Sequence, residues 1–95
     1  MGKKKEQIKI VPLSIRQVTT ISKIISLYEY KFIKNAKSDN KNGYTHYCIK
    51  SNEKFNMEEI NTIVKHFKKE YNKHLHFKKE EKLGEFFVGS FYLEE

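Results

Sequence analysis

The sequence has no tryptophan, one cysteine, one proline and four glycines among its 95 residues. The single cysteine, Cys48, excludes an internal disulfide and is typical of a reducing compartment. Apolar runs are only a few residues long, which excludes a membrane-spanning helix and a secretory signal peptide after the basic N-terminus. With 38% hydrophobic and 14% aromatic residues, the chain can still build one domain with a modest core.

Acidic residues are scarce relative to basic ones. Nineteen lysines and arginines stand against twelve aspartates and glutamates, which gives a formal net charge of +7 and a pI near 9.4. This excess is typical of proteins that bind nucleic acid, although a basic surface covered only by water has the same composition. We expect a polyanionic partner and keep the solvated basic surface as the alternative.

The apolar pattern predicts seven elements in the order β-α-β-β-α-β-β. Residues 6–11 are rich in Ile and Val and are followed by Pro12, which is typical of a short strand. Ser14 and Gln17 form a capping box that predicts a helix, and apolar residues then recur at helical spacing as far as Tyr28. Further strands are expected over 28–35, 44–50, 75–78 and 86–93, with a basic loop over 36–43 and a turn over 79–85.

The second predicted helix has the most informative pattern of the chain. Asn56 can accept a hydrogen bond from a first-turn amide, Glu59 can reach back to the Asn56 amide, and Phe55 precedes them at a hydrophobic-staple position. Lysines recur at i,i+4 spacing on the outer side, where like charges repel unless salt or a polyanion neutralises them. The apolar stripe is Ile60, Ile63, Val64, Phe67 and Tyr71, and the lysines are Lys65, Lys69 and Lys73 with Lys68 beside them.

This order predicts the α+β class, as a single sandwich with two helices packed on one face of a mostly antiparallel sheet. A helix after the first strand and another after the hairpin can cover the same face and leave the other face open. We expect one RNA-binding domain over residues 6–95, preceded by a basic, flexible arm over residues 1–5.

Three groups of residues invite a chemical interpretation, and each has a plainer one. His74-Leu75-His76 has the form with which single-strand nicking enzymes hold a metal, but without their helical tyrosine the two histidines are expected to share the exposed side of a strand. Cys48 lacks a Cys-x-x-Cys or His-x-x-x-His companion and is expected half-buried in a strand. Tyr44 and Tyr47 invite comparison with the base-stacking strand of the RNA-recognition motif, but lie on opposite faces, so one can be core.

The sequence contains no glycine-rich phosphate loop and no defensible order of catalytic serine, histidine and aspartate. We therefore expect no enzymatic activity, no cofactor, and neither catalytic nor metal-binding residues.

The second half of the chain carries four short segments, rich in aromatic and basic residues, at defined places in its predicted elements. They are Phe55-Asn56 at a helix start, Lys65-His66-Phe67 within the helix, Leu75-His76-Phe77 in the next strand and Glu85-Phe86-Phe87-Val88 in the last. With these segments, the region from Thr45 to Leu93 resembles the C-terminal half of the eukaryotic, e-type family of large-subunit ribosomal protein twenty-two. Where that family has early basic residues this helix has Met57, Glu58 and Asn61, so the expected contact surface shifts towards its C-terminal half.

The resemblance implies a structural constituent of the large ribosomal subunit on cytoplasmic ribosomes. Its implied partners are rRNA and neighbouring ribosomal proteins, with no membrane and no small-molecule substrate. The alternative is a small protein–protein inhibitor or adaptor of the kind that mobile elements encode, whose exposed Phe and Tyr residues bind a protein. The residues expected to bind RNA phosphates are Lys65, His66, Lys68, Lys69, Lys73, Lys78, Lys79, Lys3, Lys4 and Lys5.

Overall fold

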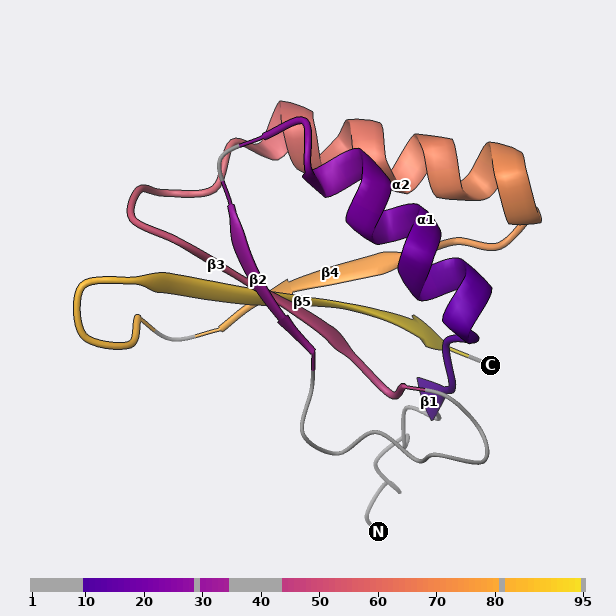
Figure 1. Ribbon diagram of the computed structural model, residues 1–95, viewed down its shortest axis with the longest axis horizontal. Coiled ribbons are helices and arrows are strands. Elements are labelled where there is room, and N and C mark those ends of the chain that lie inside the picture. The colour runs from indigo at the N-terminus through magenta and orange to yellow at the C-terminus, as the bar shows by residue number, and fades with distance from the viewer. Residues whose placement is uncertain (1–9, 29, 35–43, 81, 95) are drawn as a thin grey trace, which may run out of the picture.

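Figure 1 shows the computed structural model of the chain, which describes residues 10–28, 30–34, 44–80 and 82–94. Within these ranges two helices and five strands follow in the predicted order β-α-β-β-α-β-β. Their bounds are β1 Ile10–Val11, α1 Ile15–Ile25, β2 Lys31–Lys34, β3 Tyr47–Ser51, α2 Met57–Tyr71, β4 His76–Lys79 and β5 Phe87–Glu94.

The last strand, β5, forms the centre of the sheet. Residues 47–51 of β3 pair with residues 91–87 of β5, and residues 76–79 of β4 pair with residues 92–89. Because the two registers overlap on β5, β3 and β4 lie on its opposite sides. β1 pairs with the C-terminal end of β5, and β2 pairs with β3. Every one of these ladders is antiparallel, and the predicted α+β class is confirmed.

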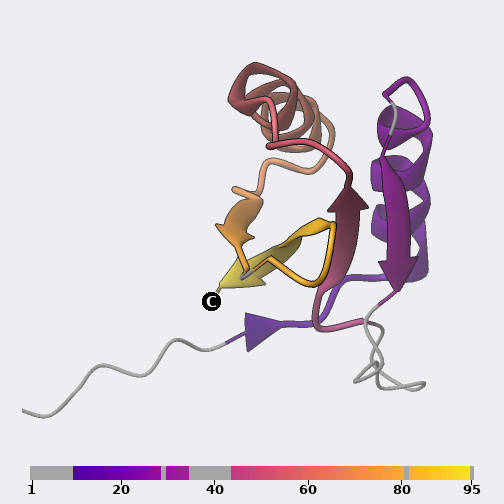
Figure 2. The same ribbon diagram turned by 90° about the vertical axis from the view of Figure 1, so that its left-hand side faces the viewer.

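The core lies between the sheet and the two helices, which cover the same face of the strands (Figures 1 and 2). Alternate residues of β3 are buried, whereas Cys48 and Lys50 between them are half-buried on the other face. In the described ranges neither helix combines the length and apolarity needed to cross a membrane. The buried apolar residues are Leu13, Val18, Ile21, Ile24, Ile25, Tyr47, Ile49, Ile60, Ile63, Phe67, Leu75, Phe91 and Leu93.

The N-terminus of α1 has the predicted capping box. The Ser14 hydroxyl accepts from the Gln17 amide at 3.1 Å, and the Gln17 side chain accepts from the Ser14 amide at 2.9 Å. The prediction that the helix continues to Tyr28 is wrong. The Ser26 hydroxyl donates to the Lys23 carbonyl oxygen at 2.7 Å, and this bond satisfies a carbonyl that further helix would otherwise use.

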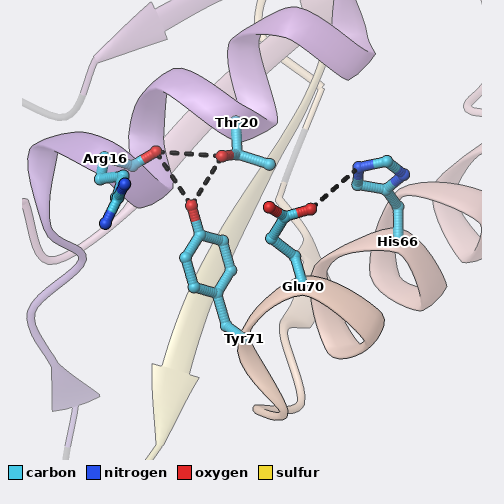
Figure 3. Close-up of polar contacts among 5 residues, drawn as sticks. All are labelled: Arg16, Thr20, His66, Glu70 and Tyr71. Atoms are coloured by element: carbon cyan, nitrogen blue, oxygen red, sulfur yellow. Dashed lines mark hydrogen bonds and ion pairs between the residues drawn. The ribbon is translucent and has the colours of Figure 1, made fainter.

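The two helices are joined by a polar contact near one end of each (Figure 3). The Tyr71 hydroxyl of α2 lies 2.7 Å from the Thr20 hydroxyl of α1 and donates to the Arg16 carbonyl oxygen at 3.3 Å. A second contact joins α1 to the sheet, where the hydroxyls of Ser22 and Tyr47 lie 2.7 Å apart. These bonds satisfy part-buried hydroxyls within an otherwise apolar interface and fix how α1 lies on the sheet.

Two observed strands start three residues later than predicted, and β4 and β5 start one residue later. Tyr28 belongs to the turn after α1, where its amide donates to the Ile25 carbonyl oxygen, so β2 starts at Lys31 instead. Tyr44 exchanges two backbone hydrogen bonds with Leu13 in an isolated bridge, so β3 starts at Tyr47. Residues 6–9 of the first predicted strand and the predicted loop over 36–43 lie outside the described residues.

In the cap of α2, the hydroxyl of Tyr30 takes the place of the direct bond that was predicted between Glu59 and the Asn56 amide. Asn56 accepts from the amides of Glu58 and Glu59 at 2.9 and 3.4 Å, as expected. The Glu59 carboxylate does not reach back to the Asn56 amide. It accepts instead from the Tyr30 hydroxyl at 2.8 Å, and that hydroxyl accepts from the Asn56 amide at 3.4 Å. Tyr30 therefore stands between the two members of the box and ties it to the sheet side of the fold.

Burial, followed by the hydrogen bond to Glu59, raises the pKa of Tyr30 to about 12. The folded protein thus holds this proton more tightly than the unfolded chain, whose tyrosines titrate near pH 10. The contribution of Tyr30 to stability is complete below pH 10 and is lost as the pH rises towards 12. Tyr30→Phe is therefore expected to flatten the fall in unfolding free energy over this range, measured by urea denaturation. Parallel pH curves for the two proteins would contradict this assignment.

Gly89 lies in the middle of β5 beneath two aromatic rings. A Cβ at this position would collide with the Phe77 ring and lie 3.2 Å from the Phe55 ring. Phe55 and Phe77 meet edge to face with centroids 5.3 Å apart. The missing side chain of Gly89 thus lets the residue that precedes the α2 cap pack directly onto the sheet.

Candidate nucleic-acid interface

The helix α2 is held firmly along one side. Ile60, Ile63 and Phe67 are buried, and Val64 and Tyr71 are half-buried against the core, as their spacing predicted. Successive residues of an α-helix turn by about 100°, so the residues between these face solvent. The core contacts leave the opposite side of α2 available for other molecules.

The solvent side of α2 carries three lysines within little more than one turn. Lys65 and Lys69 are four residues apart, Lys68 adjoins them, and all three are exposed. In the part of the chain that the structure describes, no carboxylate forms an ion pair with any of them. We call this surface the basic side of α2. Two of the three acidic residues of the helix, Glu58 and Glu59, lie in the first turn, where they interact favourably with the helix dipole. The third, Glu70, lies in the last turn and is paired with His66.

Lys73 does not continue this row. Asn72 adopts the left-handed conformation, with φ of 57°, and its amide donates to the Lys68 carbonyl oxygen at 2.7 Å. The helix therefore ends at Tyr71, and the predicted i,i+4 series of three lysines is wrong for its last member. Lys73 is exposed in the connection that leads to β4.

The two lysines predicted on the following strand lie on different faces of the sheet. Lys78 pairs with Ser90 and Lys79 with Gly89, and successive residues of a strand point to opposite faces. Lys79 is on the face that carries the helices, and Lys78 is on the other. Both side chains are exposed, but only Lys79 lies on the face of the sheet that α2 covers.

His66 stands apart from the lysines of α2. Its Nε2 atom lies 3.7 Å from a carboxylate oxygen of Glu70, and both side chains are about half exposed (Figure 3). The same two residues border the groove between α2 and α1, opposite Thr20 and Lys23. A histidine beside a carboxylate offers less attraction to a phosphate than an unpaired lysine.

The predicted Lys3, Lys4 and Lys5 lie outside the described residues.

The face of the sheet away from the helices carries a row of rings that the sequence interpretation missed. We call this face the open face. Tyr92 of β5 is stacked on His76 of β4, with centroids 5.3 Å apart and planes at 20°, and its ring lies 5.7 Å from that of His46. We call His46, Tyr92 and His76 the aromatic row. Burial and the nearby Glu94 carboxylate raise the pKa of Tyr92 above its ordinary value.

In the sequence, the alternation of side chains along the last strand could indicate that Tyr92 faces away from the core. Which residues lie beside Tyr92 depends on strand register, which the sequence does not give. His76 faces Tyr92 only because β4 and β5 pair as they do. The shared exposed side predicted for His74 and His76 is observed, since their rings lie 4.6 Å apart and Leu75 between them is buried.

Tyr47, one of the two candidate base-stacking tyrosines, belongs to the core. It is 1% exposed, and burial raises the pKa of its hydroxyl, although the bond to Ser22 acts in the opposite direction.

Cys48 is half-buried in β3, as predicted. Among the described residues, no three His, Cys, Asp or Glu side chains come together in an arrangement that suits a metal ion.

Comparison with models of protein families, with curated proteins and with solved structures finds no match to this chain.

Proposed function

We propose that this protein binds RNA and is a structural constituent of the large ribosomal subunit, with the basic side of α2 as its contact to rRNA phosphates. The observation that carries the proposal is the set of exposed lysines at 65, 68 and 69, which no described carboxylate neutralises. Lysines at i,i+4 spacing repel each other in the isolated protein, and a phosphate backbone between them removes this cost.

The support beneath these lysines suits a structural role. Three buried residues of α2 and the cap at Asn56 fix the helix on the core, so the lysines are presented by a rigid element. Contacts of this kind set position and orientation on RNA without reading its sequence. Lys73 extends the same contact, because it is exposed just beyond the C-terminal end of α2. Lys79 is exposed elsewhere, since it pairs with Gly89 beneath the Phe55 ring that precedes α2.

The ribosomal part of the proposal depends on the resemblance between residues 45–93 and the e-type ribosomal protein twenty-two family. It predicts large-subunit rRNA and neighbouring ribosomal proteins as partners, and cytoplasmic ribosomes as the location. The second half of the chain supplies the segments of that resemblance as one helix, α2, followed by β4 and β5.

A protein inhibitor or adaptor is the second candidate. One observation favours it: β2 pairs on one side only among the described strands, and Phe32 within it is 43% exposed. An edge strand of this kind can accept a strand from another protein. The other described Phe and Tyr side chains are buried or half-buried, which leaves this candidate with a smaller surface.

Sedimentation tests the proposal directly. An epitope-tagged protein in lysate of its source cells is expected to migrate with large subunits, to remain with them when the subunits are separated by magnesium depletion, and to be released by ribonuclease. Protein that stays at the top of the gradient, elutes early from heparin and carries no co-purifying RNA would reject the RNA proposal and favour the inhibitor.

A further inference from the structure

The open face is organised in rows that run across the strands. The aromatic row runs from His46, just before β3, across β5 to β4 at one end of the sheet. Two residues further along β5 lies a second row, in which Lys78 faces Ser90. A third row, two residues further again, places Lys50 and Lys31 beside each other. With a rise of about 3.4 Å per residue, the rows are about 7 Å apart.

The aromatic row is accessible to other molecules. Tyr92, His76 and His46 are each half-buried, and no described helix lies over them, since α1 and α2 cover the opposite face (Figure 2). The half-buried rings of this row expose apolar and polarisable surface to water. Bases of an unpaired strand present flat faces that stack on such rings, whereas a duplex keeps its base faces inside.

Positive charge lies next to the rings. The Lys50 and Lys31 ammonium groups lie 4.6 and 5.6 Å from the centroid of Phe86, a ring just before β5, and Lys78 projects between Phe86 and the aromatic row. Among the described residues, the face also carries two carboxylates. Glu80 accepts a hydrogen bond from Ser90 at 3.1 Å, and Glu94 lies 3.7 Å from His76. Both carboxylates thus have partners, and the three lysines leave the face attractive to phosphates.

We propose that the open face binds an unpaired segment of RNA, with a base stacked on Tyr92 and the phosphates beside Lys78 and Lys50. This inference rests on the proposed RNA-binding function but assigns it a second surface and a different form of the ligand. The basic side of α2 contacts phosphates of folded RNA, and the open face selects unpaired bases. The protein then joins a duplex on one side to a single strand on the other.

The test compares three labelled RNAs by fluorescence anisotropy: a twelve-nucleotide uridine strand, an abasic strand of the same length and a twelve-base-pair duplex. The wild type is expected to bind the uridine strand more tightly than the abasic strand. Tyr92→Leu is expected to weaken uridine binding by about 5- to 150-fold, the range for loss of one stacked base. Duplex affinity should stay within twofold of the wild type.

Two further variants separate the surfaces. Tyr28→Leu removes a half-buried tyrosine on the helix side and is expected to leave the preference for uridine unchanged. Lys78→Glu keeps the aromatic row and should weaken binding of the uridine and abasic strands equally, because both have the same phosphate backbone. This variant also tests the open face if Tyr92→Leu does not fold.

Equal binding of the uridine and abasic strands by the wild type overturns the inference, as does unchanged uridine binding by folded Tyr92→Leu. If the duplex still binds in either case, the proposed function stands without the second surface. If the wild type binds none of the three RNAs, both proposals fall and a protein partner is favoured.

Discussion

Reversing two charges on the basic side of α2, with Lys65→Glu and Lys69→Glu, is expected to weaken binding of duplex RNA by roughly 60-fold at 0.1 M salt. Each lost phosphate contact lowers the slope of log affinity against log salt by about 0.9, so the slope should flatten by about 1.8. When the two proteins bind equally at 1 M salt, a slope difference of about 1.8 makes the variant bind about 60-fold more weakly at 0.1 M salt. Anisotropy titrations at several salt concentrations measure both quantities.

The matched control for this variant is Lys54→Glu with Lys82→Glu. It changes the net charge by the same amount, and both residues are exposed outside the helices. If the basic side of α2 is the contact, the control should lose far less affinity and keep most of its salt slope. Equal losses in the two double variants would show that only net charge matters and would reject a localised interface.

Phe91→Ala is expected to lower the free energy of unfolding by about 3–5 kcal/mol. Phe91 is fully buried in the central strand, pairs with Tyr47 on one side, and packs its ring 4.9 Å from that of Phe77 on the other. Domains of this size have only about 5–15 kcal/mol in total, so the variant should be close to unfolding at 37 °C. Urea denaturation followed by circular dichroism gives the difference.

Phe32→Ala provides the comparison with the same chemical change at the edge of the sheet. Phe32 is 43% exposed, and its ring lies 5.9 Å from that of Tyr47. Because much of the side chain already meets water, we expect a loss below about 2 kcal/mol. Similar losses for the two variants would contradict the assignment of β5 as the centre of the core.

Local chemistry made the helix starts predictable from the sequence. Ser14 with Gln17 and Asn56 with the following amides cap their helices as the residue spacing indicates. The same local rules failed where a distant residue competed for a partner. Glu59 bonds to Tyr30, which is 29 residues away and was expected in a strand. A capping box predicted from four consecutive residues does not take such a competitor into account.

Strand register limited what could be predicted of the candidate sites. The spacing of Lys65 and Lys69 on one helix was enough to place them together. The meeting of His46, Tyr92 and His76 depends on which residues of three strands face each other, and that choice is made by packing across the whole sheet. Lys78 and Lys79 were expected to act together, but the alternation of side chains along β4 separates them.

The central place of β5 sets the order in which a nascent chain can build this sheet. β1, β3 and β4 all precede their common partner, and the pairing of residue 10 with residue 94 closes a loop of more than eighty residues. Until β5 has been synthesised, the described pairing of β2 with β3 is the part of the sheet that can form. The apolar faces of α1 and α2 lack a complete sheet to cover during that interval, which exposes the growing chain to chaperones and to aggregation.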